Sequence, residues 1–191
     1  AQSTWAATSS QMKTCIAVFF FLVTTAFEAR ALEWTYISDV PGSYVYCLEA
    51  YEGNIYAGTY PNGRVYRSGD GGMNWVSTGT LSGASHVVDL LSASNGYLYA
   101  ATHNLGPGVG TVFRTSNGGA TWEQILGALN GAEGGLVLLE TSDGFIYAGT
   151  GEYGEVFRTG DGGTTWESRG RFVGTMYVQS LLQASDGSLY A

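Results

Sequence analysis

The chain of 191 residues is 45% hydrophobic and only 13% charged, which is typical of a folded globular protein rather than a disordered one. Its formal net charge of −8 repels phosphate backbones, and Lys and Arg do not cluster along the chain, so we expect no nucleic acid partner. The 29 Gly, 13 Tyr, 8 Phe and 5 Trp favour short strands joined by tight turns, and hence an all-β class.

The N-terminal segment is predicted to lie outside the fold. Residues 12–31 have the layout of a secretory signal peptide: Met12-Lys13 opens a basic region, residues 16–27 are apolar apart from two threonines, and residues 29–31 fit a cleavage site. The apolar stretch is about a dozen residues long, whereas a membrane-spanning helix needs about 20. We therefore expect a secreted or periplasmic protein with no membrane span after signal removal, and interpret residues 1–11 as upstream sequence.

A motif of the form S/T-x-D/N-x-G-x-x-W, called the Trp motif below, occurs three times at residues 68–75, 115–122 and 159–166. Its hydroxyl and its Asp or Asn side chain suit hydrogen bonds to turn amides, its Gly permits a positive φ, and its indole packs on the sheet. We interpret all its defining residues as structural. They are Ser68, Asp70, Gly72 and Trp75; Thr115, Asn117, Gly119 and Trp122; and Thr159, Asp161, Gly163 and Trp166.

Further strand signals recur in register with the Trp motif. Alternating strands at residues 54–59, 97–102, 145–150 and 188–191 each follow an Asn-Gly, Asp-Gly or Glu-Gly pair, and we predict type I′ hairpin turns at the Asn-Gly and Asp-Gly pairs. An apolar run precedes each turn, and another strand leads into each Trp motif. Each unit therefore has four predicted strands, A to D in chain order, and four strands in about 40 to 50 residues are the pattern of a β-propeller blade.

The Trp motif resembles the Asp-box of BNR-repeat proteins, and the resemblance covers residues 32–191. It implies a β-propeller of four-stranded antiparallel blades: about three complete blades, a partial fourth and an orphan outer strand at residues 33–37. We expect missing C-terminal blades of the same chain beyond residue 191. The orphan strand either completes the last blade, which closes the ring and removes an exposed edge, or is an unpaired flanking segment.

The strand order places the Trp motifs, which are C–D hairpins, on one face of the disc and the B–C and D–A loops on the other. Long loops on rigid scaffolds often carry function, so we predict that the ligand binds on the loop face. Its two exposed tyrosines have ring faces that suit stacking on a sugar. The candidate residues are Tyr60, His103, Asn104, Glu152 and Tyr153.

Asp89 departs from the repeat on strand A, and it is the one catalytic candidate, as an acid, a base or a ligand. The alternative is a solvated carboxylate in the channel. A glycosidase needs two carboxylates about 5 to 10 Å apart, and sequence spacing does not pair Asp89 with a second one. Arg67, Arg114 and Arg158 occupy equivalent rather than convergent positions, so we interpret them as repeat residues and not as the carboxylate clamp of a sialidase.

Two functions remain open. No metal-ligand spacing, nucleophile elbow or phosphate-binding loop occurs in the sequence, and we expect no metal and no cofactor. The leading hypothesis is a secreted binding or scaffold propeller with a carbohydrate or protein ligand. The alternative, which the BNR resemblance implies, is a secreted glycoside hydrolase, sialidase-like or xyloglucanase-like, with catalytic residues partly in further blades.

Overall fold

The computed structural model describes residues 35–41, 44–104, 110–126, 137–151 and 153–191, and the regular secondary structure in these ranges is all β. The predicted upstream sequence and signal peptide lie outside the described residues. Within the described ranges, no helix has the length and apolar character needed to cross a membrane.

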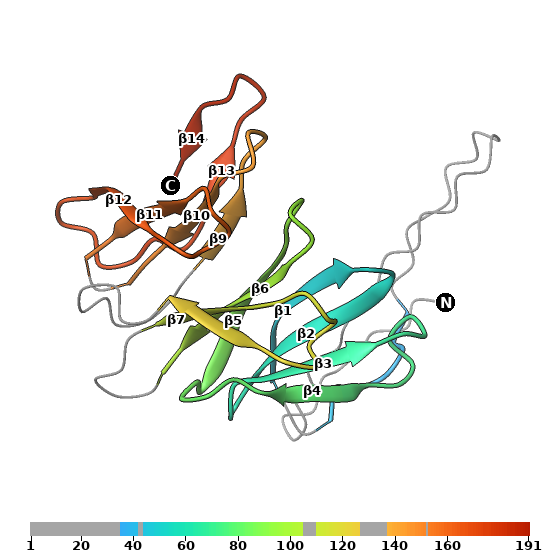
Figure 1. The fold of residues 1–191 in the computed structure, drawn as a ribbon. Coiled ribbons are helices and arrows are strands. Elements are labelled where there is room, and N and C mark those ends of the chain that lie inside the picture. The colour runs from blue at the N-terminus through green and yellow to red at the C-terminus, as the bar shows by residue number, and fades with distance from the viewer. Residues whose placement is uncertain (1–34, 42–43, 105–109, 127–136, 152) are drawn as a thin grey trace, which may run out of the picture.

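In the described part of the chain, three antiparallel sheets contain four strands each, paired in chain order (Figure 1). Blade 1 consists of β1 (Tyr44–Tyr51), β2 (Asn54–Tyr60), β3 (Arg64–Ser68) and β4 (Val76–Thr80); blade 2 of β5 (His86–Ser92), β6 (Leu98–His103), β7 (Thr111–Thr115) and β8 (Glu123–Leu126); and blade 3 of β9 (Val137–Glu140), β10 (Ile146–Gly149), β11 (Glu155–Thr159) and β12 (Glu167–Arg171). A hairpin of β13 (Leu182–Gln183) and β14 (Leu189–Tyr190) begins a fourth blade. The predicted fold, a β-propeller of four-stranded antiparallel blades, is confirmed.

The turns between the first two strands of each blade differ in part from the prediction. At Glu52-Gly53 both residues have positive φ, 48° and 74°, as a type I′ turn requires. At Asn95-Gly96 only the glycine does, at 82°, because Asn95 Oδ1 accepts a hydrogen bond from the Tyr97 amide (3.1 Å) and the Asn backbone stays at negative φ. The type I′ prediction is wrong for this turn and also for Asp143-Gly144 and Asp186-Gly187, where only the glycine has a positive φ.

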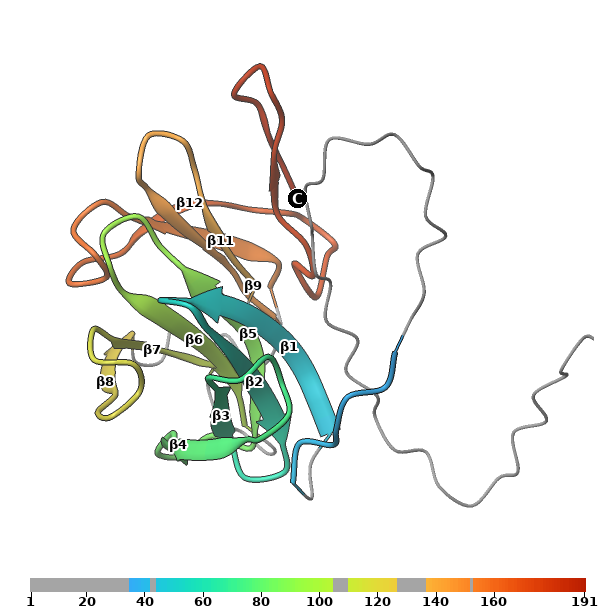
Figure 2. The same ribbon diagram turned by 90° about the vertical axis from the view of Figure 1, so that its right-hand side faces the viewer.

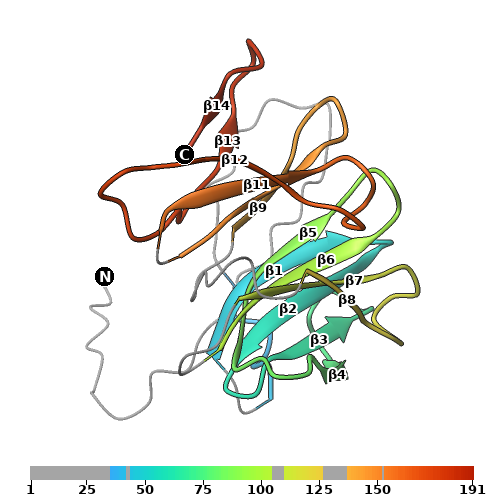
Figure 3. The same ribbon diagram turned by 60° about the vertical axis from the view of Figure 1, so that its left-hand side comes forward.

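The hydrophobic core lies between successive blades, which stack as layers in Figure 3. Each interface combines inner-strand side chains of one blade with those of the next and with the indole of the next Trp motif. The buried cluster between blades 1 and 2 contains Tyr51, Tyr56, Val65, Leu81, Val87, Leu90, Leu98, Ala100 and Phe113, with Trp122 against it. The cluster between blades 2 and 3 contains Ala93, Tyr99, Ala101, Val112, Leu138, Ile146, Ala148 and Phe157, with Trp166 against it.

Polar contacts also join each blade to the next Trp motif. The Tyr56 hydroxyl donates to the carbonyl of Gly118 (3.2 Å), and in the next blade the Tyr99 hydroxyl donates to the carbonyl of Gly162 (3.1 Å). Arg114 adds a second bond to Gly162, from Nη1 at 2.6 Å. Because the same contact recurs, the Trp motif holds the blades together as well as turning the chain.

The arginines that precede the Trp motifs make local contacts in their own blades. Arg114 pairs with Glu123 (2.9 Å) and Arg158 pairs with Glu167, in each case across the third and fourth strands. Their guanidinium groups lie 4.8 and 4.2 Å from the centroid of an aromatic ring in the same blade. These contacts agree with their interpretation as repeat residues.

The predicted orphan strand covers residues 33–37, of which the structure describes 35–37, and the segment at residues 35–40 is not a strand. It has no strand beside it among the described residues, and a strand requires a partner. The segment is nevertheless fixed on blade 1: the Ser38 hydroxyl donates to the carbonyl of Gly72 (2.5 Å), Trp75 Nε1 donates to that hydroxyl (3.2 Å), and Val40 is buried. It thus lies against the first Trp motif.

The outer strands of complete blades make the corresponding contact. A Cβ built on Gly119 would lie 2.8 Å from the Cβ of Thr78 in β4, and one built on Gly163 would lie 2.3 Å from Cδ1 of Ile125 in β8. The segment at residues 35–40 therefore occupies, on blade 1, the place that the preceding outer strand occupies on blades 2 and 3.

Candidate ligand-binding site

The hydroxyl and the Asp or Asn oxygen of each Trp motif form hydrogen bonds within the motif. In the second motif, Thr115 Oγ1 donates to Asn117 Oδ1 (2.8 Å) and accepts from the amides of Gly119 (3.1 Å) and Asn117 (3.3 Å), while Asn117 Oδ1 also accepts from the Thr121 amide (3.0 Å). The first and third motifs repeat this pattern. These groups form a structural corner, because little hydrogen-bonding capacity is left for a ligand.

The carboxylates of the first and third motifs are held in their charged form. Hydrogen bonds from Asn74 and Ser68 lower the pKa of Asp70 to about 2. Bonds from Thr165 and Thr159 lower the pKa of Asp161 in the same way. Asn117 takes the equivalent place in blade 2 without a charge, so the corner needs the oxygen acceptor rather than the negative charge.

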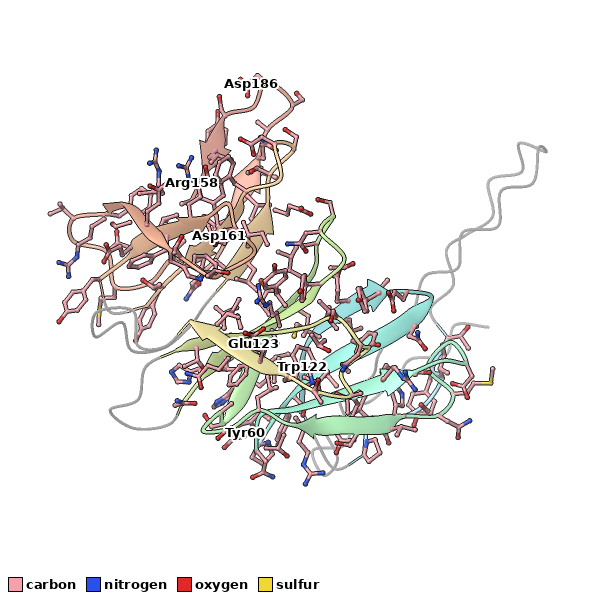
Figure 4. The ribbon with its side chains drawn as sticks, viewed as in Figure 1. Tyr60, Trp122, Glu123, Arg158, Asp161 and Asp186 are labelled. Carbon is pink, nitrogen blue, oxygen red and sulfur yellow. The ribbon has the colours of Figure 1, made fainter. Side chains whose placement is uncertain are left out.

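The opposite ends of the strands form the loop face. Figure 2 shows the inner strands β1, β5 and β9 side by side, with the outer strands β4 and β8 on the far side. Strand register places Tyr44 opposite Tyr60 and His86 opposite His103, at the ends away from the Trp motifs. In Figure 4, Tyr60 lies at an edge of blades 1 and 2, well separated from Asp161 and Arg158 of blade 3.

Five ring side chains gather there and form what we call the tyrosine–histidine cluster: Tyr44, Tyr46, Tyr60, His86 and His103. The Tyr60 ring stacks on His86, with centroids 4.2 Å apart and planes 17° apart. Tyr46 and His103 meet the same imidazole edge-on, each at 5.3 Å. Tyr44 and Tyr46 remain 56% and 55% exposed, so the cluster offers aromatic surface to solvent.

The cluster favours a neutral imidazole at its centre. Burial lowers the pKa of His86, the charge of His103 lowers it further, and a hydrogen bond to the His103 backbone opposes both. A neutral ring stacked on a phenol presents an apolar face with polar edges, which suits ligands that combine a flat apolar face with hydroxyl groups.

Some of the predicted ligand residues lie close together in the structure, and another lies in a different blade. Tyr60 and His103 lie in the cluster, both in contact with His86, and Asn104 follows His103 directly at the end of β6. Glu152 lies outside the described residues. Tyr153 belongs to blade 3, where the Arg171 guanidinium lies 3.9 Å from its ring centroid and Arg171 Nε donates to its carbonyl.

The sequence interpretation missed Tyr44, Tyr46 and His86 as site residues. They begin β1 and β5, directly after the D–A loops, and therefore lie on the same face as the ends of β2 and β6. Strand register could have predicted them, because an aromatic residue at the start of strand A lies opposite the last residue of strand B.

A groove of about 430 Å³ adjoins the cluster through Tyr46 and runs along the inner strands. Its walls are mainly apolar, with one carboxylate and one amide. They consist of Tyr46, Val88, Asp89, Val137, Tyr177, Val178 and Gln179. The cluster and this groove together provide a surface on which an extended ligand can lie.

Asp89 joins two blades. Its Oδ1 accepts from the Leu90 amide (2.9 Å) and its Oδ2 from the Leu138 amide of blade 3 (2.7 Å). Burial raises the pKa of Asp89, and the two amide bonds oppose that rise. Asp89 is thus half-buried and lines the groove, and both of its oxygens accept backbone hydrogen bonds.

Other acidic side chains of the inner strands have similar roles. Glu49 Oε1 accepts from the Ser92 amide of blade 2 (3.1 Å), and Glu140 of blade 3 accepts from the amide and hydroxyl of Ser94 in blade 2. Burial raises the pKa of Glu49, and the charge of Asp89 contributes to the rise. These carboxylates link neighbouring blades. In the described ranges, no three His, Cys, Asp or Glu side chains are placed to hold a metal ion together.

A larger hollow of about 580 Å³ lies between blade 3 and the β13–β14 hairpin. Tyr147 and Val156 line it, and they correspond to Tyr99 and Val112, which are fully buried between blades 2 and 3. The hollow is therefore a continuation of the blade-packing surface, and we place the candidate site at the tyrosine–histidine cluster instead.

The fold is that of a β-propeller protein, and an aromatic surface lies on the face opposite its structural corners. No family model matches the chain, and no curated protein matches it. Among solved structures, it is similar to a protein of unknown function from Dyadobacter fermentans, with a TM-score of 0.58 and 19% identity over 83% of this chain and 59% of that one. It is also similar to a GH74 enzyme from Niastella koreensis, with a TM-score of 0.52 and 20% identity over 72% of this chain and 24% of that one.

At these identities the likeness concerns the fold alone. The chain spans 59% and 24% of the lengths of the two structures.

Proposed function

We propose that this chain is part of an extracytoplasmic BNR/Asp-box propeller that binds carbohydrate, without cleaving it, at the tyrosine–histidine cluster. The observation that carries the proposal is the exposure of Tyr44 and Tyr46 beside the stacked Tyr60–His86 pair. Tyrosine rings expose faces that suit the apolar side of a pyranose, and they lose little conformational entropy on binding. The signal-like sequence at residues 12–31 supports export.

The roles of the acidic side chains favour binding over catalysis. Asp89, Glu49 and Glu140 accept hydrogen bonds from backbone amides of a neighbouring blade, and the carboxylates of the Trp motifs accept bonds within their own corners. A glycosidase needs one carboxyl group as an acid and a second as a base or nucleophile.

Hydrolysis of a glycoside is the second candidate function. The fold likeness to the GH74 enzyme supports it, as does the raised pKa of both Asp89 and Glu49, since a general acid needs such a shift. The test is release of the aryl group from a panel of aryl glycosides by the wild-type chain and by Asp89→Asn. Release that requires Asp89 would favour the hydrolase; no release by the wild-type chain is the result expected for a binding module.

Binding is tested by affinity gel electrophoresis against soluble hydroxyethyl cellulose, xylan and mannan. Tyr60→Ala removes the ring that stacks on His86, and we expect it to weaken the retarding interaction about tenfold, the size of one good aromatic contact. Tyr153→Ala, an exposed tyrosine in the equivalent loop of blade 3, is the matched control and is expected to bind like the wild type. Equal effects of the two substitutions, or no retardation by any polysaccharide, would contradict the proposal.

A further inference from the structure

Ser85 contacts both its neighbour His86 and the strand opposite. Its hydroxyl oxygen lies 2.7 Å from the carbonyl oxygen of His103 and 2.8 Å from Nδ1 of His86. The Ser85 amide donates to the same His103 carbonyl at 3.1 Å. Ser85 is therefore attached to the end of β6 by two bonds, while its side chain also reaches the imidazole of His86.

Counting hydrogens assigns the tautomer of His86. A serine hydroxyl has one hydrogen to donate, and a carbonyl oxygen only accepts, so the hydrogen of Ser85 points to His103. The remaining contact between the Ser85 oxygen and His86 Nδ1 needs a hydrogen on Nδ1. In a neutral imidazole the other nitrogen, Nε2, then has a free lone pair.

Among the described residues, the side-chain hydrogen bond of the His86 ring is made at Nδ1. Tyr60 covers one face of the ring, and Tyr46 and His103 approach it edge-on, from β1 and β6. In the described part of the chain, the groups in contact with the ring are the phenols of Tyr46 and Tyr60, the imidazole of His103 and the Ser85 hydroxyl. A hydrogen bond to the His103 backbone also acts on the His86 pKa.

We propose that Ser85 holds His86 in the Nδ1–H tautomer so that Nε2 accepts a hydrogen bond from a hydroxyl group of the ligand in the tyrosine–histidine cluster. His86 is then the polar contact of a site whose other contacts are aromatic, and it selects a ring with a hydroxyl donor beside its apolar face. Ser85 is a positioning residue. This inference rests on the proposed carbohydrate-binding function and adds to it the residue and atom that recognise the ligand.

The assignment predicts a pH dependence of binding. Protonation places a hydrogen on Nε2 and turns the acceptor into a donor. Burial and His103 lower the pKa of His86, so the ring is neutral at pH 7. Binding is therefore strongest above the His86 pKa and weakens as the pH falls through it.

Nitrogen NMR of the full chain tests the tautomer without any ligand. In wild-type protein above the His86 pKa, we expect a protonated Nδ1 and an unprotonated Nε2. In Ser85→Ala we expect a mixture of the two His86 tautomers. In Ser85→Thr, which keeps a hydroxyl, we expect the Nδ1–H tautomer alone. A dominant Nε2–H tautomer in the wild-type chain would overturn the assignment alone and leave the proposed function standing.

Titration with hydroxyethyl cellulose between pH 8 and pH 4 tests the ligand contact. His86→Phe keeps a ring for stacking but has no acceptor, and we expect about tenfold weaker binding at pH 8 with no dependence on pH, since one hydrogen bond is lost. His86→Gln keeps an acceptor oxygen and is expected to bind better than His86→Phe, also without the pH dependence.

The two proposals fail differently. If Tyr60→Ala loses binding while His86→Phe retains the affinity and pH profile of the wild type, the His86 assignment is wrong and the cluster remains the site. If the wild-type chain does not bind at any pH, the proposed function and the ligand contact of His86 are both wrong, whatever tautomer NMR finds.

Discussion

The two faces of the propeller use polar side chains in opposite ways. On the face of the Trp motifs, each blade repeats one corner, and the hydroxyl and Asp or Asn oxygens bond to the corner's own amides. On the loop face, blade 3 has Gly151 at the position of Tyr60, and the rings of Tyr60 and His86 contact each other. The comparison teaches that repetition along this chain marks structure, and departure from repetition marks the candidate site.

The difference extends to electrostatics. Hydrogen bonds lower the pKa of Asp70, which keeps its corner charged, whereas burial lowers the pKa of His86, which keeps the cluster neutral. The first effect stabilises a turn at the edge of the disc. The second leaves an uncharged surface for a neutral ligand.

Substitution of a corner glycine gives the largest expected loss of stability. Ala at Gly119 would need a φ of +85° and would place its Cβ 2.8 Å from the Cβ of Thr78 in blade 1. Backbone strain and crowding together are expected to lower the free energy of unfolding by about 3 kcal/mol. Gly96→Ala is the control, because φ is similar (+82°) but no atom lies within 4 Å, so only about 1 kcal/mol is expected. If urea unfolding gave equal losses of free energy for the two variants, crowding against Thr78 of blade 1 would not contribute to the effect of Gly119→Ala.

Removal of one corner hydroxyl has a smaller expected effect. Thr115→Val keeps the shape of a side chain that is 3% exposed but leaves the Gly119 amide without its acceptor. We expect a loss of about 2 kcal/mol, the cost of one buried unsatisfied donor. Thr80→Val, at the exposed end of β4, should change stability by less than about 0.5 kcal/mol. An unchanged free energy of unfolding in Thr115→Val would show that the corner does not need the Thr115 hydroxyl as a hydrogen-bond acceptor.

The smallest expected effect is a change in acid stability. The pKa of Asp70 in the folded chain is about 2, and that of Asp161 is also lowered, whereas an unfolded Asp titrates near about 3.9. Their contribution to stability is therefore present above about pH 4 and is lost as the pH falls toward about 2. The double variant Asp70→Asn and Asp161→Asn should show a flatter decline of the melting temperature over this interval. An unchanged decline would contradict the charge assignment of the corners.

The sequence was sufficient to predict the blades because each carries several local signals in a fixed order. The Trp motif, the glycine turn and the alternating strand B constrain one another, and their predicted positions agree with the strands from β1 to β12. The turn type at Asn95-Gly96 was not predictable from the pair alone, since the Asn95 side chain accepts a bond from the Tyr97 amide while the Gly96 amide donates to the Ala93 carbonyl.

The candidate site was only partly predictable. Tyr60 and His103 were found from loop position, but they meet through His86, a strand residue that is assigned by register and not by loop length. The role of Asp89 was missed for another reason: its partner, the Leu138 amide, lies in the next blade, and the sequence does not specify how blades pack.

The central claim is that ligands bind on the loop face and that the Trp motifs only build the fold. Its most direct test compares two double variants in the hydroxyethyl cellulose titration at pH 8, with melting temperature measured in parallel. We predict that Tyr46→Ala with Tyr60→Ala abolishes binding at nearly unchanged melting temperature, and that Asp70→Asn with Asp161→Asn retains wild-type affinity. Loss of binding in the Asp70 and Asp161 variant, with wild-type affinity in the tyrosine variant, would contradict the account.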